Sequence, residues 1–211
     1  MDLNVSIDTK AAMQTARLLG FNVIALNKNV LATADLRGHR SKFETTDFPG
    51  LRILRRLTIS VNQPAQLAQL SKLDISSMGY DLFAIRPMND SVLKSLIESP
   101  LHNLDIMSLD LTQPILTSSM RPALAKVISS GVQIEVEFSS CLKDSSGRVQ
   151  CINQCRNVLA TFKSGVFISS GAKNVLEMRS NTDLTNFAMH VLGLRDCLPT
   201  LKTRPVQQID D

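Results

Sequence analysis

Aromatic residues are scarce in this chain of 211 residues: they make up 4% of it, with no tryptophan and a single tyrosine. This scarcity argues against a surface of stacked aromatics, on which single-stranded nucleic acids commonly bind. Aliphatic and methionine side chains must therefore fill the interior, and hydrophobic residues, at 44%, are sufficient for a sizeable core. No apolar run approaches the roughly 18 residues of a membrane span, and no leader peptide is expected.

Metal ligands and nucleophile motifs are also few. The three histidines, His39, His102 and His190, stand far apart, and none forms an HxH or HxxE pair. The four cysteines include no CxxC pair, so reduced structural thiols are expected rather than a zinc site. The GxSxG, GxGxxG and P-loop motifs are absent, and only SSGAK loosely resembles a phosphate-binding loop. The common nucleophilic and nucleotide-binding enzymes are therefore not indicated.

Short runs rich in valine and isoleucine alternate with helical patterns along the chain. They predict strands near residues 3, 24, 57, 83, 106, 134 and 167, with helices between most of them. This alternation predicts a parallel sheet with right-handed crossovers, and runs such as LFAI fit a sheet buried on both faces. We therefore expect an α/β fold, a TIM-like barrel of about seven strand–helix units in a single domain. An open doubly wound sheet is the alternative.

Two segments interrupt this rhythm. Residues 28–50 form a long polar connection without clear periodicity, which is typical of a functional or flexible loop. Residues 199–211 are polar and contain two prolines, so they are predicted to be a flexible tail. The barrel domain is assigned to residues 1–198.

The carboxyl ends of the strands are the place where barrels bind ligands. The residues predicted there are mainly amides and hydroxyls: Asn4, Ser6, Asn27, Ser60, Arg86, Asp110, Ser139, Ser169 and Ser170. A metal-dependent hydrolase needs several His, Asp or Glu ligands at these positions. The set therefore predicts neither a metal centre nor a catalytic acid–base pair, and Asp110 is expected to make local hydrogen bonds.

Basic residues follow several of the predicted strands. The chain has 23 Lys and Arg against 19 Asp and Glu, and a net charge of +4 favours an acidic partner only weakly. The basic residues at the predicted rim are Arg86, Lys143, Arg148, Lys173 and Arg179. Guanidinium forks and ammonium groups suit phosphate oxygens. The other interpretation is a solvated rim whose ion pairs contribute little.

Several stretches, over about residues 2–194, stand in an order that resembles a known family. They are DLNV, ILRRLTISV, YDLFAIRP, LDIMSLDL, RPALAKVISSGVQIEVEFSSCLKDSSGR, FISSGAKNVLEMRS and a final helix ending LGL. The family is the thirty-kilodalton protein subunit shared by ribonuclease P and RNase MRP, whose barrel is related to PHP-type phosphoesterases. PHP enzymes carry a DLHxH-like strand where this chain has DLNVS. The resemblance thus implies that Asn4 and Ser6 replace two metal ligands, for which neutral amide and hydroxyl groups are poor substitutes.

The resemblance implies a non-catalytic subunit, without cofactor or metal, of a ribonucleoprotein that acts in transfer-RNA 5′-leader removal and ribosomal-RNA precursor processing. The implied partners are ribonuclease P RNA, RNase MRP RNA and other protein subunits, including a small ferredoxin-like one. The positions that match basic residues of the family are Arg56, Arg121, Lys143, Arg148 and Arg179. They are expected to contact RNA or other subunits, and Arg86 and Lys173 are added from their predicted rim position alone.

Alternatives remain open from the sequence. Arg56 lies within a predicted strand, where a structural ion pair is as good an interpretation as an RNA contact. Ser130 stands where the family often has an arginine, which removes one expected contact. The chain as a whole is alternatively a metal-dependent PHP-type phosphoesterase or a protein–protein adaptor without RNA contact. The long connection over residues 28–50 resembles eukaryotic members, which implies the nucleus and nucleolus.

Overall fold

The computed structural model describes residues 1–32, 36, 40, 41, 48–142 and 144–199. Within this part, parallel strands form one sheet in which order in space follows order in sequence. They are β1 (Asp2–Val5), β2 (Val23–Leu31), β3 (Arg52–Val61), β4 (Leu82–Pro87), β5 (Ile106–Leu109), β6 (Gln133–Glu137) and β7 (Val166–Ser169). The sheet curls until Val5 bridges to Ala172, just beyond β7, where the Ser6 N–H donates to the Ala172 carbonyl at 2.9 Å. The predicted barrel is confirmed, and the open-sheet alternative is wrong.

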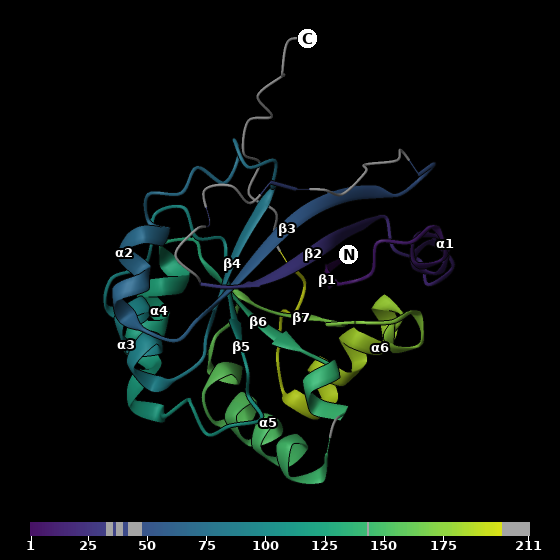
Figure 1. Cartoon of the computed structure of the whole chain (residues 1–211). Coiled ribbons are helices and arrows are strands. Elements are labelled where there is room, and N and C mark those ends of the chain that lie inside the picture. The colour runs from purple at the N-terminus through teal and green to yellow at the C-terminus, as the bar shows by residue number, and fades with distance from the viewer. Residues whose placement is uncertain (33–35, 37–39, 42–47, 143, 200–211) are drawn as a thin grey trace.

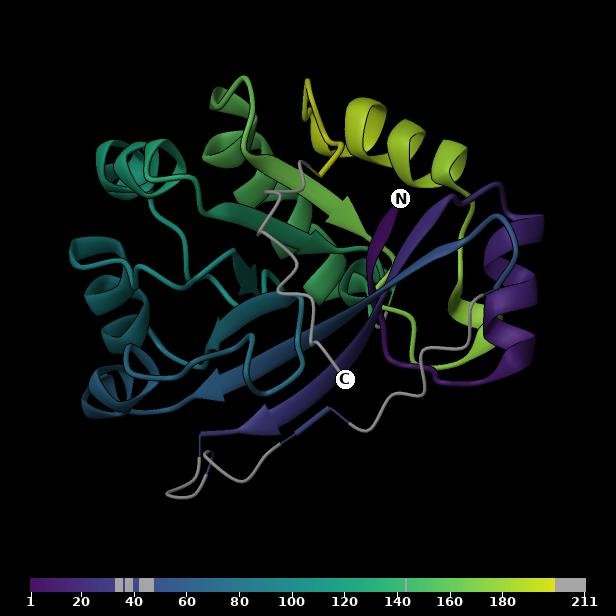
Figure 2. The same ribbon diagram turned by 90° about the horizontal axis from the view of Figure 1, so that it is seen from above.

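Helices form an outer ring around this barrel, as Figures 1 and 2 show. They are α1 (Lys10–Leu18), α2 (Leu67–Leu70), α3 (Asp90–Glu98), α4 (Arg121–Ser129), α5 (Ser145–Asn157) and α6 (Asn181–Asn186), the last continued by a π-helical segment, η6 (Phe187–Leu192). The side chains of Thr9, Asn89 and Asp144 cap α1, α3 and α5 by accepting the N–H three residues further on. Each cap satisfies one of the free amides of a first helical turn. No described helix is long and apolar enough to cross a membrane.

The two faces of the sheet bury different side chains, because successive strand residues point in opposite directions. Outward-facing residues such as Leu57 and Ile59 of β3 belong to the large core between barrel and helices. Inside the barrel lies a small apolar cluster, made by Leu3, Ala25, Leu54, Leu82, Ala84, Ile106 and Phe167. Nearer the carboxyl ends of the strands the interior is polar, beginning with Arg56 and Thr58 on β3. This polar layer is where the candidate site begins.

Element boundaries differ from the sequence prediction in one place that concerns the site. β2 continues to Leu31, because it stays paired with β3 as far as Leu31 opposite Ser60. The first residues of the connection predicted over 28–50 are therefore strand, and Leu36 further along is buried in the outer core. Residues 33–35, 37–39 and 42–47 of this connection lie outside the described residues, as does the predicted tail beyond Pro199.

The glycine that ends the turn before β7 offers a test of this packing. Gly165 has a φ of +82°, and a Cβ added there would lie 2.3 Å from Cγ2 of Ile128. Gly20 has a φ of +81° with nothing within 4 Å of an added Cβ. We expect Gly165→Ala to lower the free energy of unfolding by about 2–4 kcal/mol and Gly20→Ala by only about 1 kcal/mol. Urea unfolding of both variants measures this, and equal losses would contradict the packing described.

Candidate functional site

The centre of the polar layer is an ion pair between β3 and β6. Arg56 and Glu135 are both 0% exposed, and their side chains meet in a two-pronged contact, Nη1 to Oε1 at 2.7 Å and Nη2 to Oε2 at 2.6 Å. Arg56 also donates to the Leu3 carbonyl at 2.8 Å and to Oγ1 of Thr58 at 3.0 Å. The guanidinium therefore ties β3 to β6 on one side and to β1 on the other.

The Arg56 guanidinium favours the charged form of the buried Glu135 carboxylate. Burial by itself would raise the pKa of Glu135, but the charge and hydrogen bonds of Arg56 hold that pKa below its usual value. A buried ion without its partner is strongly destabilising, whereas a fully hydrogen-bonded pair is tolerated. The Arg56 guanidinium therefore holds the buried Glu135 carboxylate in its charged form.

A chain of hydrogen bonds leads from this pair toward the mouth of the barrel. Thr58 Oγ1 donates to Asn27 Oδ1 at 2.8 Å, and Asn27 Nδ2 donates to Asn4 Oδ1 at 2.7 Å. Asn4 Nδ2 donates in turn to Glu137 Oε1 at 2.8 Å. Both ends of the Asn4 amide are thus used inside the protein. Ser6, the other residue singled out on the first strand, lies further out and accepts from Asn29 Nδ2 at 3.2 Å.

Glu137 closes the network at the carboxyl end of the barrel. Its carboxylate forms an ion pair with Arg86, and Ser140 Oγ donates to it at 3.3 Å. Arg86 also donates to Ser108 Oγ at 3.1 Å. Asp110 accepts from the N–H and hydroxyl of Thr112 at 3.1 and 2.6 Å, which is the local role predicted for it. Among the described residues, no group of three or more His, Cys, Asp or Glu is placed to hold a metal ion.

Asp2 sits at the seam where the barrel closes. Its Oδ1 accepts from the Asn4 N–H and from the Ser170 N–H, each at 3.2 Å, so one carboxyl group joins the first strand to the end of β7. Burial raises the pKa of Asp2 to about 6, and the hydrogen bonds from Ser170 and Asn4 offset only part of that effect. This side chain therefore titrates near neutral pH inside the fold.

Arg56 is fully buried, so the prediction that it contacts RNA is wrong. The structural ion pair, which was the alternative, is the one found. The sequence QIEVE of β6 could have predicted this buried ion pair. Glu135 and Glu137 alternate with Ile134 and Val136 on a strand predicted to be buried on both faces. Two carboxylates on one face of such a strand require basic partners inside the barrel. Neither glutamate was recognised from the sequence.

Three other arginines that were predicted to contact RNA or other subunits donate hydrogen bonds to backbone carbonyls. Arg121 donates to the carbonyl of Asn157, the last residue of α5, and Arg148 Nε donates to the Cys141 carbonyl at 3.1 Å. Arg179 Nη1 donates to the carbonyls of Leu176 and Met178 at 2.8 and 2.9 Å. Each side chain therefore has a structural task, and the exposed Arg148 can in addition reach a ligand.

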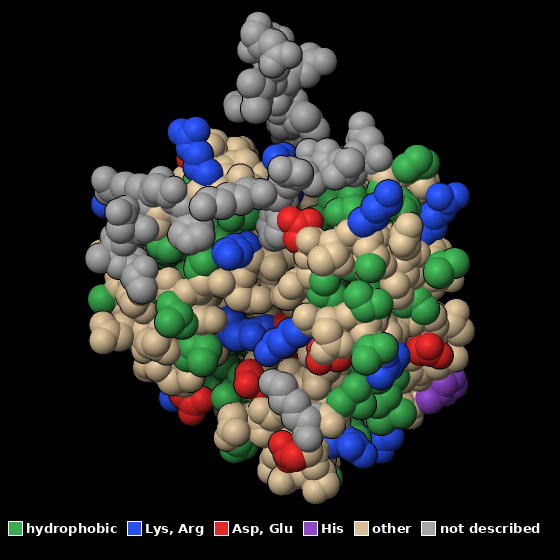
Figure 3. Space-filling model, turned by 45° about the vertical axis from the view of Figure 1, so that its right-hand side comes forward, with side chains coloured by type: hydrophobic (Ala, Val, Ile, Leu, Met, Phe, Trp, Pro, Cys, Tyr) green, Lys and Arg blue, Asp and Glu red, His purple; other side chains and the backbone are tan. Residues whose placement is uncertain are grey.

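Two of these arginines and Lys173 share one sector of the mouth. Arg148 lies in the first turn of α5, which follows β6, while Lys173 and Arg179 follow β7. The Ser139 N–H donates to the Ser170 carbonyl at 3.0 Å and so joins the segments that follow β6 and β7. Lys173 is exposed, whereas Arg86 is partly buried in its ion pair with Glu137. Lys143 lies outside the described residues. Figure 3 shows one face of the molecule, where basic and acidic side chains lie beside each other.

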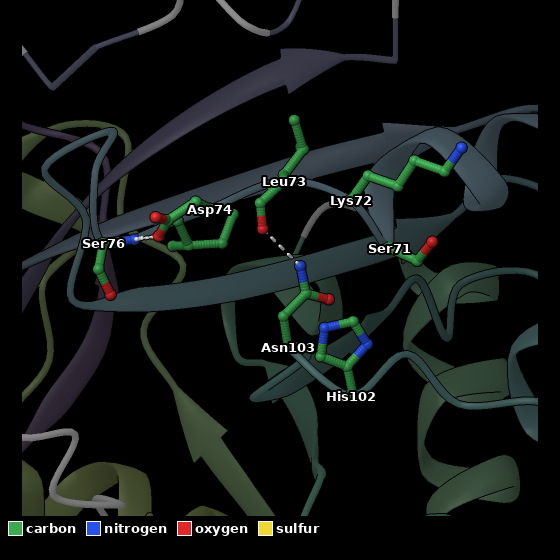
Figure 4. A pocket seen from close by; sticks show the side chains of 8 residues that line it. Ser71, Lys72, Leu73, Asp74, Ser76, His102 and Asn103 are labelled. Atoms are coloured by element: carbon green, nitrogen blue, oxygen red, sulfur yellow. Dashed lines mark hydrogen bonds between the residues drawn. The ribbon is translucent and has the colours of Figure 1, made fainter.

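A separate cavity of about 460 Å³ lies at the opposite, amino-terminal end of the strands, in the loops before β4 and β5. Figure 4 shows Asn103 of one loop pointing toward Leu73 of the other, with His102 beside Asn103. Asn103 Nδ2 donates to the carbonyls of Leu70 and Leu73 at 3.1 and 3.0 Å, so it caps the end of α2. The Asn103 amide therefore stabilises the two loops that line the cavity.

Fold and site together define a class of protein: a closed parallel α/β barrel whose mouth is filled by its own hydrogen-bonded amides and ion pairs, with cations on the loops outside. The sequence pattern of the family described as RNase P subunit p30 matches residues 1–198. The chain therefore belongs to this family.

Similar proteins agree with this assignment. The chain is 32% identical over 151 residues to Protein GAMETOPHYTE DEFECTIVE 1 of Arabidopsis thaliana, covering 71% of this chain and 25% of that protein. It is 24% identical over 200 residues to Ribonuclease P/MRP protein subunit RPP1 of Saccharomyces cerevisiae, covering 86% and 64%. The chain thus spans a quarter of the Arabidopsis protein and less than two thirds of the Saccharomyces protein. A chain from a cryo-EM structure of archaeal ribonuclease P with mature tRNA shares the fold, with a TM-score of 0.67 at 16% identity and coverage of 100% and 99%.

Removing one partner of the central ion pair tests its role. We expect Arg56→Met to lower the free energy of unfolding by about 3–5 kcal/mol, because it leaves the Glu135 carboxylate buried without its cation. Adding Glu135→Gln to that variant should restore part of the loss, since the uncompensated charge is then removed. Denaturant unfolding of both variants measures this. A double variant that is less stable than Arg56→Met would show that the charge is not what makes the single change costly.

The seam carboxyl predicts a specific pH dependence. The pKa of Asp2 rises from 3.8 to about 6 on folding, so the folded protein keeps a proton that the unfolded chain loses in this window. Stability therefore falls as pH rises from about 4 to 6, by up to about 3 kcal/mol. Asp2→Asn has no such proton, so its stability relative to the unsubstituted protein should increase across the same window. Thermal unfolding of both from acid to neutral pH measures this, and parallel curves would refute it.

Proposed function

We propose that this chain is a non-catalytic protein subunit of ribonuclease P, and of RNase MRP, that stabilises the RNA and the neighbouring subunits of the particle. The observation that carries the proposal is the family match over residues 1–198. The Saccharomyces relative bears the name of a ribonuclease P/MRP subunit, and the archaeal structure that shares the fold is of ribonuclease P with mature tRNA. The reactions proposed for the particle are transfer-RNA 5′-leader removal and ribosomal-RNA precursor processing.

The mouth of the barrel supports a role without catalysis by this chain. Asn4 hydrogen-bonds at both ends of its amide, and the Glu137 carboxylate accepts from Asn4, Ser140 and Arg86. A general base or a metal ligand needs an oxygen or nitrogen that can face the substrate or the metal. Here these groups are engaged with one another. We accordingly assign Asn4 and Ser6 to holding the barrel together rather than to binding metal.

The loops outside the mouth are the surface that we assign to RNA. Arg148 is exposed in the first turn of α5, Lys173 is exposed after β7, and Arg179 further along the same segment is partly exposed. Backbone contacts already hold Arg148 and Arg179, so less side-chain freedom is lost when they meet a phosphate. Lys143 and Arg121 remain candidates for the same role, as does Arg86. We further propose that the chain acts in the nucleus and nucleolus.

Exchanging cations at this surface tests the proposal. We expect the pair Arg148→Ala and Lys173→Ala to weaken retention of RNA in the purified ribonucleoprotein. It should also reduce the slope of log affinity against log salt by about 1 for each phosphate that the protein no longer neutralises. Arg52→Ala is the matched control, because Arg52 is exposed at the first residue of β3, at the other end of the barrel.

The measurement is quantitation of co-purifying RNA over a series of KCl concentrations. Recovery of ribonuclease P or MRP RNA with the unsubstituted protein supports the subunit assignment. An unchanged salt slope in the double variant would remove these two residues from the RNA surface. A particle from which no RNA is recovered would favour a protein–protein adaptor instead.

A further inference from the structure

The segment after β7, residues Ser170–Arg179, is here called the β7 loop. It is anchored at both ends, since Ala172 bridges to Val5 across the barrel seam and Met178 is buried in the outer core. Gly171, just before the first anchor, turns the chain with a φ of +62°, and an added Cβ there would lie 2.6 Å from Ser139 Oγ. The loop therefore leaves the sheet in one defined direction, packed against the loop that follows β6.

Hydrogen bonds within the β7 loop hold its outer half. The Glu177 carboxylate accepts from the Lys173 N–H at 2.8 Å and from Asn174 Nδ2 at 2.6 Å, while Asn174 Oδ1 accepts from the Glu177 N–H at 3.2 Å. This reciprocal arrangement is a capping motif around one helical turn. Arg179 supports it from the other side by donating to the Leu176 and Met178 carbonyls, with its guanidinium 5.8 Å from the centre of the Phe138 ring.

Leu176 stands at the tip of this rigid loop and is 88% exposed, more than any other large apolar side chain among the described residues. Single exposed leucines are ordinary at protein surfaces. Leu18 is such a case, with 87% exposure at the last residue of α1, where helices fray. Leu176 differs because the backbone on both sides of it is fixed by side-chain hydrogen bonds. An apolar side chain that is already positioned loses little freedom on binding, which is a property of interface anchors.

The surroundings of Leu176 indicate the chemistry of its partner. Lys173 is exposed and Arg179 partly exposed, whereas the Glu177 carboxylate is occupied by hydrogen bonds within the loop. Lys173 and Arg179 against the one carboxylate of Glu177 leave the loop with a formal charge of +1 beside the leucine. An aliphatic side chain offers RNA neither a hydrogen bond nor a stacking surface, whereas it fills an apolar pocket on a protein well. The complementary surface is thus an apolar pocket bordered by carboxylates.

We propose that Leu176 is an anchor by which the β7 loop docks into an acid-rimmed apolar pocket on a neighbouring protein of the particle. The proposal relies on the subunit role inferred above only for the source of that neighbour. Lys173 and Arg179, which we also assign to RNA, then lie at the border between the two partners, so that one sector of the mouth would contact both a protein and RNA.

The test uses the full chain in the purified ribonucleoprotein, with a benzophenone amino acid placed at position 176 or, as control, at position 18. Light should join position 176 to one protein, in an adduct that survives ribonuclease digestion, and should join position 18 to none. Leu176→Asp should then lower the recovery of that same protein about tenfold or more, because it removes the apolar anchor and repels the acidic rim. Leu18→Asp should leave recovery unchanged.

Three results would overturn the proposal: an adduct at position 176 with RNA alone, no adduct there, or full recovery of the cross-linked protein with Leu176→Asp. Circular dichroism and thermal unfolding of Leu176→Asp establish that the fold is intact, which is expected because the side chain is exposed. RNA recovered with the unsubstituted protein reports on the proposed function separately. A failed cross-link from a particle that contains its RNA would refute the docking surface and leave the subunit role standing.

Discussion

The ion pair between Arg56 and Glu135 is the interaction on which the rest of the barrel interior depends. It joins strands that are separated by two others, and neither charge could stay buried without its partner. Its geometry fixes the register of β3 and β6, since a shift of either strand by one residue would turn that strand's charged side chain to the outer face. The network then extends to Glu137 in three steps: Thr58 donates to Asn27, Asn27 donates to Asn4, and Asn4 donates to Glu137.

This interior has a consequence for what the protein can do. Barrels of this kind place their chemistry at the carboxyl ends of the strands, where polar groups from several strands converge. In this protein most of the converging groups hydrogen-bond to one another, and Arg86 covers Glu137 from the neighbouring side, whereas Asp2 Oδ2, Arg86 Nε and Ser169 Oγ have no hydrogen-bond partner among the described residues. Polar side chains remain there, but they stabilise the fold. We propose that contact with partners is made outside the mouth, where Arg148 and Arg179 donate to backbone carbonyls and still reach solvent.

Some of this could be predicted from the sequence. Valine- and isoleucine-rich runs at regular intervals marked the strands, because each is a local pattern that a buried parallel strand requires. The neutral residues Asn4 and Ser6 on the first strand, and the absence of paired histidines, were also visible without a structure. The roles of the arginines were not. Arg121 was expected to face a partner, yet it caps the end of α5 at Asn157, which is 36 residues away in sequence. Such a contact leaves no local pattern.

The sequence by itself determined that the chain forms a parallel α/β barrel of this family and that the first strand carries an amide and a hydroxyl. Only the tertiary structure decided that Arg56 faces Glu135 inside the barrel and that Leu176 faces solvent on a fixed loop. The physical reason is that strand periodicity specifies alternation but not which face is inward, and that choice depends on pairing between distant strands. Exposure of a loop residue likewise depends on contacts such as those of Arg179 and Phe138, which form only after the barrel has closed.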